Sequence, residues 1–193
     1  MKKSLDIREL RKDDFQAVME IDEMIRGFSR PDYWQRRFIN AESIPPWASL
    51  VADVREPQSN EADNRMVGFL FGWSSMWDFG LRDEVGWIDV IGVHPAYRFG
   101  GIGRALVNEF NRLAKDRRRV EKVFTLVDPA EAETSGFFSQ IGFARGKLIQ
   151  MERSSGHFYP ESRGPNGSRT LKIGKNSRIS PNIAKPKKDG KRV

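Results

Sequence analysis

The feature that most restricts the fold is a glycine-rich turn between an apolar strand and an amphipathic helix. Residues 91–104 read Ile-Gly-Val-His-Pro-Ala-Tyr-Arg-Phe-Gly-Gly-Ile-Gly-Arg. Gly100, Gly101 and Gly103 have no Cβ, so the backbone amides from Arg98 to Arg104 can close around an anion. The first N–H groups of a helix also lack acceptors within that helix, and they favour negative charge. The turn therefore predicts a phosphate cradle.

Two other nucleotide-binding motifs fit this segment poorly. A dinucleotide-binding G-x-G-x-x-G would need a glycine where Leu106 stands, and the turn lies in the middle of the chain rather than in its first strand–helix unit. The sequence has no G-x-x-x-x-G-K-[ST] motif, which excludes a P-loop. For this segment alone, a turn that merely starts a helix remains an alternative.

What remains is the pattern Arg-x-x-Gly-x-Gly, formed by Arg98, Gly101 and Gly103 after a strand that ends in Val-His-Pro. This pattern resembles motif A of the GNAT superfamily of N-acetyltransferases, in which the turn binds the pyrophosphate of acetyl-CoA. A second segment, Phe137–Phe143, resembles the family's apolar-Tyr-x-x-x-Gly-Phe ending of the fourth helix. The resemblance covers about residues 5–153, and two landmarks at the expected separation are stronger than one.

The spacing of apolar residues predicts an α/β fold. We expect strands over residues 5–10, 49–54, 66–74, 86–93 and 123–127, with a last strand pair over 143–152. We expect helices from a cap at Asp13 or Asp14 to Gly27, and over 32–39, 102–119 and 131–140. The order β-α-α-β-β-β-α-β-α-β-β matches the GNAT fold, a mixed sheet of about seven strands with about four helices.

Charge divides the chain into two parts. The net charge is +7, yet residues 154–193 hold 10 basic and two acidic residues, so the part before residue 154 is nearly neutral. We therefore expect an acetyltransferase domain over 1–153 and a flexible basic tail rich in Gly, Pro, Ser and Lys over 154–193. A solvated terminus is the favoured interpretation of the tail, and electrostatic binding to nucleic acid is the alternative.

Composition excludes several classes of protein. The chain has no cysteine and only two histidines, so disulfides, thiolate sites and a histidine-based metal centre are excluded, and we expect no metal. The N-terminus lacks an apolar signal region, and the longest apolar stretch, Met66–Trp73, is too short to span a membrane. We expect a cytoplasmic protein that forms a monomer or a homodimer and does not bind membranes.

The resemblance implies which residues hold acetyl-CoA. In GNAT enzymes the central strands separate next to the glycine turn, and the pantetheine arm pairs with the exposed strand edge, here 90–93. A backbone N–H near Gly92 or Val93 is then placed to stabilise charge on the thioester carbonyl. The residues that we expect to contact the cosubstrate are Ile91, Gly92, Val93, Arg98, Phe99, Gly100, Gly101, Ile102, Gly103, Arg104 and Phe138.

The reaction needs a general base, because an ammonium has no lone pair with which to attack a thioester. Some family members carry the base at the position of Trp87, which cannot serve here. By strand alternation Trp87, Asp89, Ile91 and Val93 share one face, so Asp89 is the first candidate for the base. Glu84 is the second candidate. A structural role for Asp89, such as an ion pair with an arginine, remains an alternative.

The second landmark also departs from the family. Many members use the tyrosine of the fourth helix as the acid that protonates the departing thiolate, but the matching residue is Phe138. The CoA thiol resembles a cysteine thiol of pKa about 8.5, so its thiolate can leave without protonation by an acid. We therefore expect the missing acid to lower the rate by about 100-fold rather than to abolish activity. Tyr33 is one alternative source of a hydroxyl. His94 lies in a Val-His-Pro segment that is common at this position in the family, and we expect a structural role for it.

The acceptor is expected to be an amine. Residues 27–34 and 73–80 are the segments that frame the acceptor in this family, and here they combine aromatic side chains with acids. The acids Asp78, Asp83, Glu84 and Asp89 suit a cationic amine on a small molecule, a peptide or a protein. Core packing of the tryptophans and a solvated acidic rim remain the alternatives.

These observations predict an N-acetyltransferase that moves an acetyl group from acetyl-CoA to a primary amine by direct attack in a ternary complex. Two other functions remain open at this point. The loss of the family's tyrosine at Phe138 leaves room for a non-catalytic acyl-CoA-binding module. The basic tail leaves room for a nucleic-acid-associated protein.

Overall fold

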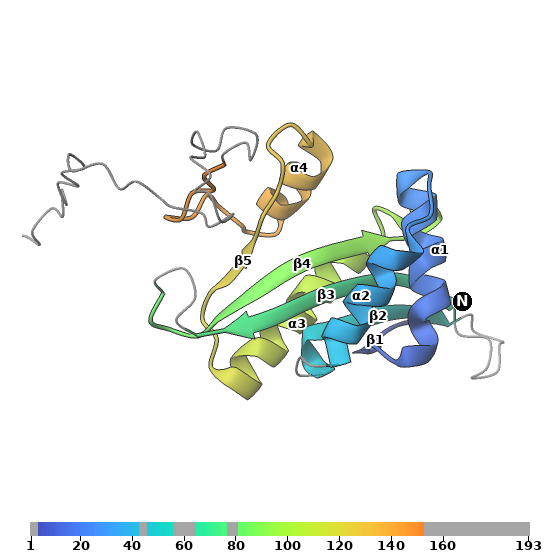
Figure 1. Ribbon diagram of the computed structural model, residues 1–193, viewed down its shortest axis with the longest axis horizontal. Helices are drawn as coiled ribbons and strands as arrows, with labels where there is room; N and C mark the ends of the chain where they lie inside the picture. The colour runs from blue at the N-terminus through green and yellow to red at the C-terminus, as the bar shows by residue number, and fades with distance from the viewer. Residues whose placement is uncertain (1–3, 43–45, 56–64, 77–80, 153–193) are drawn as a thin grey trace, which may run out of the picture. The chain divides into compact units, whose positions relative to one another are not determined.

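The elements of the computed structural model follow the predicted order through the fourth helix (Figure 1). The structure describes residues 4–42, 46–55, 65–76 and 81–152. The chain divides after Lys147, and every element named below belongs to the first unit, residues 1–147. The strands are β1 (Ser4–Glu9), β2 (Ser49–Arg55), β3 (Arg65–Ser75), β4 (Val85–Val93) and β5 (Val123–Thr125). The helices are α1 (Phe15–Arg26), α2 (Pro31–Glu42), α3 (Ile102–Arg118) and α4 (Ala132–Gln140).

The strands form one mixed sheet in the order β1-β2-β3-β4-β5. Neighbours are antiparallel from β1 to β4, whereas β5 runs parallel to β4. The parallel pair needs a crossover connection, and α3 supplies it. The predicted α/β class and the mixed sheet are therefore confirmed.

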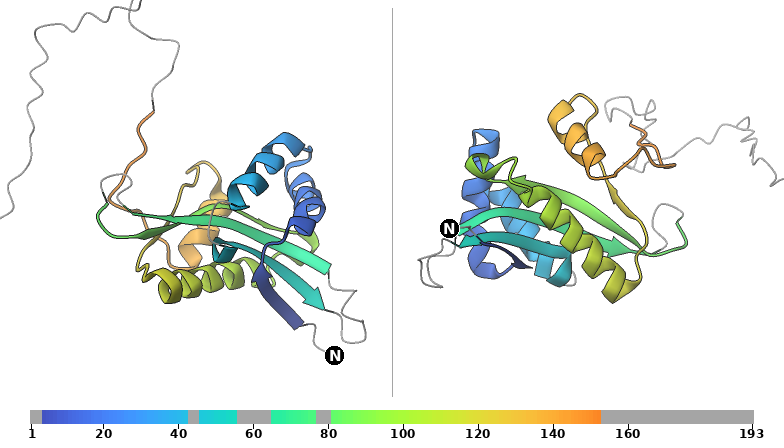
Figure 2. Two further views of the ribbon diagram at one scale, coloured as in Figure 1. Left: turned by 60° about the horizontal axis from the view of Figure 1, so that its bottom comes forward. Right: turned by 180° about the vertical axis from the view of Figure 1, so that it is seen from behind.

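Helices cover both faces of the sheet (Figure 2). The α3 helix carries apolar residues at helical spacing, and Leu106 and Phe110 are completely buried with residues of β2, β3 and β4. On the opposite face Val18 of α1 and Trp34 of α2 are also completely buried, together with Phe69 of β3. Burial of one apolar face of each helix against the sheet is the main stabilising contribution of these contacts.

Two glycines let the Phe110 ring lie directly against the sheet. A Cβ on Gly72 would lie 2.6 Å from Phe110 Cε2, and a Cβ on Gly86 would lie 3.2 Å from Phe110 Cε1. Both separations are shorter than the usual contact of about 3.5–4.0 Å between carbon atoms. Because Gly72 of β3 and Gly86 of β4 lack side chains, α3 packs close to the sheet at Phe110. This contact fixes the position of α3, the helix that begins at the glycine turn.

The predicted last strand pair over residues 143–152 is wrong. The structure describes this whole segment, and none of it is a strand. The apolar side chains Leu148, Ile149 and Met151 are 41%, 64% and 83% exposed. An alternating apolar pattern favours a strand only where a sheet buries one face, and these side chains are not buried. The described part of the chain thus has five strands instead of about seven.

The length of α2 and the role of Asp14 also differ from the sequence predictions. The second helix is longer than the predicted 32–39, because it runs from Pro31 to Glu42. Asp14 stands at the N-cap of α1, but its side chain makes no capping hydrogen bond. Its carboxylate instead accepts a hydrogen bond from the Arg11 backbone N–H at 2.7 Å and binds Arg8. The boundary at residue 153 and the predicted tail, residues 154–193, lie outside the described residues.

Arg8 joins β1, β2 and the start of α1 through a partly buried ion-pair cluster. Its Nη1 and Nη2 donate to the two Asp14 carboxylate oxygens at 2.8 Å each, and its Nε donates to Asp53 Oδ2 at 2.7 Å. Burial opposes ionisation of Asp14, yet the hydrogen bonds from Arg8 and from the Arg11 N–H hold the pKa of Asp14 below its ordinary value. The folded protein therefore binds fewer protons at this site than the unfolded chain does.

We expect acid to destabilise the protein through this cluster. The contribution of Asp14 is present above the unfolded pKa of about 4 and is lost as the pH falls through the lower folded value. Asp14→Asn should lower the free energy of unfolding by about 2–3 kcal/mol at pH 7 and flatten its dependence on pH below about 4. Urea unfolding at several pH values measures both effects. The exposed neighbour Asp13 provides the control, since Asp13→Asn should change neither; equal slopes for the two variants would contradict the prediction.

Neither a helix that could span a membrane nor a cluster that could hold a metal ion occurs among the described residues. No helix among them is long and apolar enough to cross a membrane. No group of three or more histidine and carboxylate side chains among them is arranged to hold a metal ion.

Candidate active site

The glycine turn connects the end of β4 to the start of α3, as its sequence predicts. A short 3-10 helix, Pro95–Tyr97, comes first, and His94 caps it by accepting the Ala96 backbone N–H on Nδ1 at 3.1 Å. The backbone then takes left-handed dihedral angles at Phe99, with φ 63°, and at Gly101, with φ 81°. The histidine therefore has a structural role in shaping the turn.

The turn leaves open space beside its backbone at two of its glycines. The N–H of Ala105 makes the first bond of α3, to Gly101 O at 2.9 Å, so the N–H groups of residues 102–104 precede that ladder. A Cβ on Gly101 would meet nothing within 4 Å, and a Cβ on Gly100 would meet only Tyr97 O, at 3.4 Å. An anion can therefore approach this backbone closely, as the phosphates of acetyl-CoA require.

Gly103 has a different reason to be glycine. A Cβ there would lie 3.1 Å from the Phe137 ring of α4. The absence of a side chain thus lets the first turn of α3 contact α4. The three glycines of the turn divide into two that leave space above the backbone and one that permits close helix packing.

Two arginines and one phenylalanine surround the turn. Arg98 pairs with Glu133 of α4, with Nη1 3.1 Å from Oε1, and Arg104 Nη2 donates to the Gln140 carbonyl oxygen at 3.4 Å. The Phe99 side chain is 99% exposed. The cations add positive charge around the N-terminus of α3, which already favours anions.

One edge of β4 is unpaired beside the turn. β5 pairs with β4 only at Gly86↔Val123, Trp87↔Phe124 and Ile88↔Thr125. From residue 89 to residue 93, β4 has no partner strand on this side among the described residues. Unpaired strand edges present N–H and C=O groups that bind extended amide chains. The pantetheine arm of acetyl-CoA is such a chain, so this edge fits it.

A β-bulge in β4 determines where Asp89 points. Phe71 of β3 pairs with Val90 and Gly72 pairs with Ile88, so Asp89 is the extra residue. Ile88 packs into the cluster on the α3 face, whereas Val90 packs into the cluster on the face of α1 and α2. Asp89 lies on the α1 and α2 face, where its carboxylate contacts an arginine of α2.

The bulge also corrects the predicted alternation along β4. Trp87 stands opposite Trp73, on the face away from the Gly72 and Gly86 positions that contact α3. Ile91 and Val93 pack on the α3 face instead. The prediction that they share a face with Asp89 is therefore wrong, because one extra residue shifts the period by one.

Asp89 is not a free carboxylate. Its Oδ2 accepts a hydrogen bond from Arg37 Nη1 and forms an ion pair with that arginine. The Asp89 and Arg37 side chains are 28% and 32% exposed. The sequence suggests an arginine partner for Asp89 only as an alternative, and it does not identify Arg37. No local pattern could have found it, since the pair joins residues 52 positions apart.

Glu84, the second predicted base, lies elsewhere. Its Oε1 accepts hydrogen bonds from Ser74 Oγ at 2.9 Å and from Arg118 Nε at 2.7 Å. Arg118 ends α3, the helix that begins at the glycine turn, so Glu84 is at the far end of that helix. The structure therefore does not bring the two predicted bases together.

Phe138, which stands where the family has its acid, and Tyr33, the alternative source of a hydroxyl, both have well-defined neighbours. Phe138 is 4% exposed and packs edge-on against Phe143, with ring centroids 5.0 Å apart. Phe138 therefore packs in the hydrophobic core, and its predicted contact with the cosubstrate stays a prediction. Tyr33 lies on α2, under the Arg30 guanidinium at 4.0 Å from its ring centroid.

The segments expected to frame the acceptor are described in part. Three aromatic rings stack across neighbouring strands, with centroids 5.5 Å apart for Trp73 and Trp87 and 5.1 Å apart for Trp87 and Phe124. Trp87 is 9% exposed, so this row is largely packed. Asp83 is exposed, and Asp78, with the rest of 77–80, lies outside the described residues.

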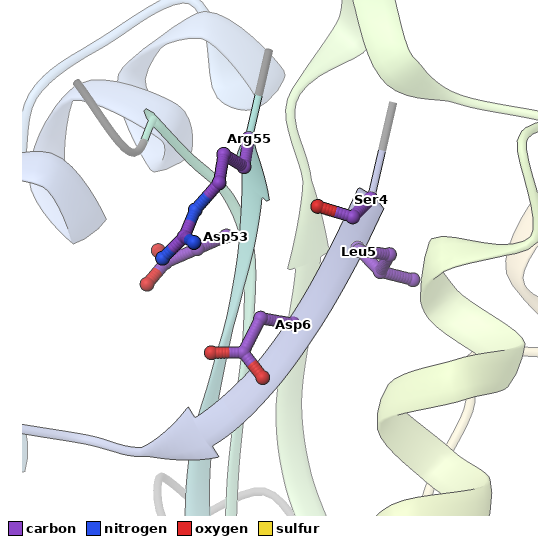
Figure 3. A pocket seen from close by; sticks show the side chains of 5 residues that line it. All are labelled: Ser4, Leu5, Asp6, Asp53 and Arg55. Carbon is purple, nitrogen blue, oxygen red and sulfur yellow. The ribbon is translucent and has the colours of Figure 1, made fainter. Parts of the chain in front are cut away.

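A surface hollow at the other edge of the sheet does not belong to this site (Figure 3). It lies where β1 begins and β2 ends, and it is lined by Ser4, Leu5, Asp6, Asp53 and Arg55. β1 is separated from β4 by two strands, so none of the predicted site residues contributes to the hollow.

Comparisons with known proteins agree with this geometry. The sequence model of the acetyltransferase (GNAT) family matches residues 6–143, well over half of the chain. Mycothiol acetyltransferase of Salinispora tropica is 28% identical over 112 residues, which are 58% of this chain and 35% of that protein. The same enzyme of Salinispora arenicola is 29% identical over 75 residues, 39% of this chain and 24% of that protein. The chain thus matches about a third or less of the length of these relatives.

Solved structures share the fold at lower identity. The aminoglycoside N-acetyltransferase AAC(6′)-Iy in complex with CoA superposes with a TM-score of 0.62 at 15% identity, covering 80% of this chain and 97% of that chain. The ribosomal-protein-alanine N-acetyltransferase of Brucella melitensis biovar Abortus gives 0.57 at 18% identity, covering 78% and 100%. Because the family match spans the strand edge, the bulge and the glycine turn together, the chain belongs to the GNAT family of acetyltransferases.

Proposed function

We propose that this protein transfers the acetyl group of acetyl-CoA to a primary amine by direct attack in a ternary complex. The observation that carries the proposal is the edge of β4 from residue 89 to residue 93, which β5 leaves unpaired directly beside the glycine turn. Two proteins with the same fold are named for acetyl transfer to nitrogen, on an aminoglycoside and on a ribosomal-protein alanine. These names support an amine acceptor as a class.

The donor would be held by backbone groups more than by side chains. Ile91, Gly92 and Val93 would pair with the pantetheine amides, and an N–H near Gly92 or Val93 would stabilise charge on the thioester oxygen. The phosphates would be bound by the turn. The residues assigned to them are Arg98, Phe99, Gly100, Gly101, Ile102, Gly103 and Arg104.

Asp89 is the carboxylate assigned to the acceptor. It lies on the bulge at the start of the unpaired edge, and Oδ1 has no hydrogen bond to any residue that the structure describes. In the proposed reaction the neutral amine nitrogen bonds to the acetyl carbon, and the amine proton passes to Asp89 directly or through water. The C–S bond breaks with its electron pair on sulfur, so CoA leaves as a thiolate that takes up a proton from water. A neutral α-amine costs less to form at pH 7 than a neutral lysine side chain, about 1.4 against about 4.6 kcal/mol.

Assays with a panel of amines test the proposed function. Purified protein with acetyl-CoA should acetylate at least one member among lysine peptides, peptides with free N-termini, polyamines and aminoglycosides. Acetyl-CoA binding without acetylation of any amine would favour the non-catalytic acyl-CoA-binding module instead. Absence of acetyl-CoA binding would contradict both functions.

The two candidate bases can be separated by a matched pair of neutral variants. Asp89→Asn should lower kcat by about 100-fold or more, because the carboxylate that receives the amine proton is lost, with unchanged acetyl-CoA affinity. Glu84→Gln should leave kcat within about twofold, since Glu84 binds Arg118 and Ser74 at the far end of α3. Steady-state kinetics and calorimetric titration with acetyl-CoA measure these effects. If the loss of kcat follows Glu84 instead, the assignment of Asp89 is wrong.

A further inference from the structure

We infer that Arg37 is an internal counter-ion for Asp89 with which a cationic acceptor competes, so that Arg37 lowers the affinity of the enzyme for its amine. The inference rests on the proposed acceptor role of Asp89. It gives Arg37 a role in positioning and selecting the amine. Arg37 lies in α2, outside the glycine turn and outside the end of α4, the two segments that resemble the family.

Arg37 pairs with the same carboxylate that a substrate ammonium would bind. Its Nη1 donates to Asp89 Oδ2, on the bulge where the unpaired edge of β4 begins. A guanidinium and a primary ammonium are both cations that donate N–H hydrogen bonds to carboxylates. Each binds the single negative charge of Asp89 more weakly while the other is present, even when the ammonium binds Oδ1 and the guanidinium binds Oδ2. The acceptor and Arg37 therefore compete for Asp89.

The ion pair is accessible enough to be exchanged. The Arg37 and Asp89 side chains are 32% and 28% exposed, so water reaches both. Ion pairs of this kind contribute about 1 kcal/mol or less, which is little for a bound substrate to overcome. A fully buried pair would instead leave a costly unpaired charge when it opened.

Arg37 has a second contact that it can keep when it leaves Asp89. Its guanidinium carbon lies 5.1 Å from the centroid of the Tyr33 ring, within the range of a cation–π interaction. Tyr33 is in turn held by Arg30, whose guanidinium carbon is 4.0 Å from the same centroid. The displaced guanidinium thus retains an aromatic partner on its own helix.

The aromatic partner is itself fixed to the protein core. Arg30 donates through Nε and Nη2 to the two oxygens of the buried Asp22, at 2.7 and 2.8 Å. Trp34 Nε1 donates to the same carboxylate at 2.8 Å. Asp22 and Arg30 therefore hold the Tyr33 ring in place. Arg37 contacts this ring and also reaches Asp89 at the candidate acceptor site.

Removal of the Arg37 charge provides the test. Arg37→Gln should lower the KM for a cationic amine by about fivefold, because Asp89 no longer has an internal partner. The KM for acetyl-CoA should not change, since Arg37 lies on α2 and the turn lies before α3. Arg37→Lys keeps a cation at this position and should restore most of the wild-type KM. Calorimetric titration of spermidine and of a lysine peptide into the CoA-bound protein gives the same comparison without turnover.

A double-mutant cycle distinguishes competition from a structural role of Arg37. In the Asp89→Asn background the carboxylate is absent, so Arg37→Gln should no longer tighten amine binding. Equal tightening in both backgrounds would mean that Arg37 acts by repulsion alone, and this result overturns the inference. An unchanged or weaker affinity in Arg37→Gln also overturns it, the latter because Arg37 would then bind the acceptor itself.

The inference and the proposed function fail in different ways. Acetylation of an amine by the wild-type protein with no effect of Arg37→Gln on KM or Kd contradicts the inference only. Absence of acetylation by the wild-type protein contradicts the proposed function, while the titrations with spermidine still report whether Arg37 competes at Asp89.

Discussion

Gly101→Asp is expected to weaken acetyl-CoA binding by at least about 100-fold while leaving the protein folded. A carboxylate at this position would face the phosphates, and two like charges about 4 Å apart near a protein surface repel by about 4 kcal/mol. The fold should tolerate the substitution because a Cβ on Gly101 would meet no atom within 4 Å. Calorimetric titration with acetyl-CoA measures the affinity, and thermal unfolding verifies the fold.

Gly101→Asn is the matched control. Asparagine has nearly the same size as aspartate and meets the same left-handed backbone, φ 81°, but it carries no charge. We expect it to weaken binding by about tenfold at most, through strain of about 1 kcal/mol. Equal losses for the two variants would show that shape and not charge excludes the ligand. Wild-type affinity in Gly101→Asp would remove the phosphate site from the turn.

Phe110→Ala is expected to have the largest effect on stability, a loss of about 3–5 kcal/mol in the free energy of unfolding. The Phe110 ring is completely buried and fills the space that Gly72 and Gly86 leave between α3 and the sheet. Gly72 and Gly86 have no side chains that could move into the cavity left by the ring. Denaturant unfolding measures the loss, and a lower thermal midpoint should accompany it.

Two further variants keep the stability prediction testable. Phe28→Ala removes the same kind of ring from a side chain that is 60% exposed, and it should change the free energy of unfolding by about 0.5 kcal/mol or less. Phe110→Leu keeps most of the volume and should lose about 1.5 kcal/mol, in case the alanine variant does not fold. A loss below about 1 kcal/mol in Phe110→Ala would contradict the close packing of α3 against β3 and β4.

Local patterns predicted most of the elements well. The helices α1, α3 and α4 and the strands β1 to β4 lie within a few residues of their predicted ranges, since each has a clear apolar period or a clear end signal. The segment 143–152 was predicted wrongly, because its alternation has no sheet to bury it. The length of α2 was underestimated, since a helix can extend beyond its apolar residues once its first turns are packed.

The sequence by itself determined the parts of this protein that depend on neighbours in the chain. A turn with glycine at 100, 101 and 103 before an amphipathic helix requires only local backbone geometry, and it was enough to predict a phosphate cradle and the family to which the chain belongs. The loss of the family's tyrosine at Phe138 was also visible in the sequence.

Only the tertiary structure decided what surrounds the reacting groups. The bulge at Asp89 depends on the register between β3 and β4, and the short pairing of β5 leaves the edge of β4 open. The partner of Asp89 is Arg37, 52 positions earlier in the chain, while Glu84 binds Arg118 at the other end of α3. Contacts between distant segments carry no periodicity that a sequence can display, because they follow from how the sheet pairs and which helix covers each face.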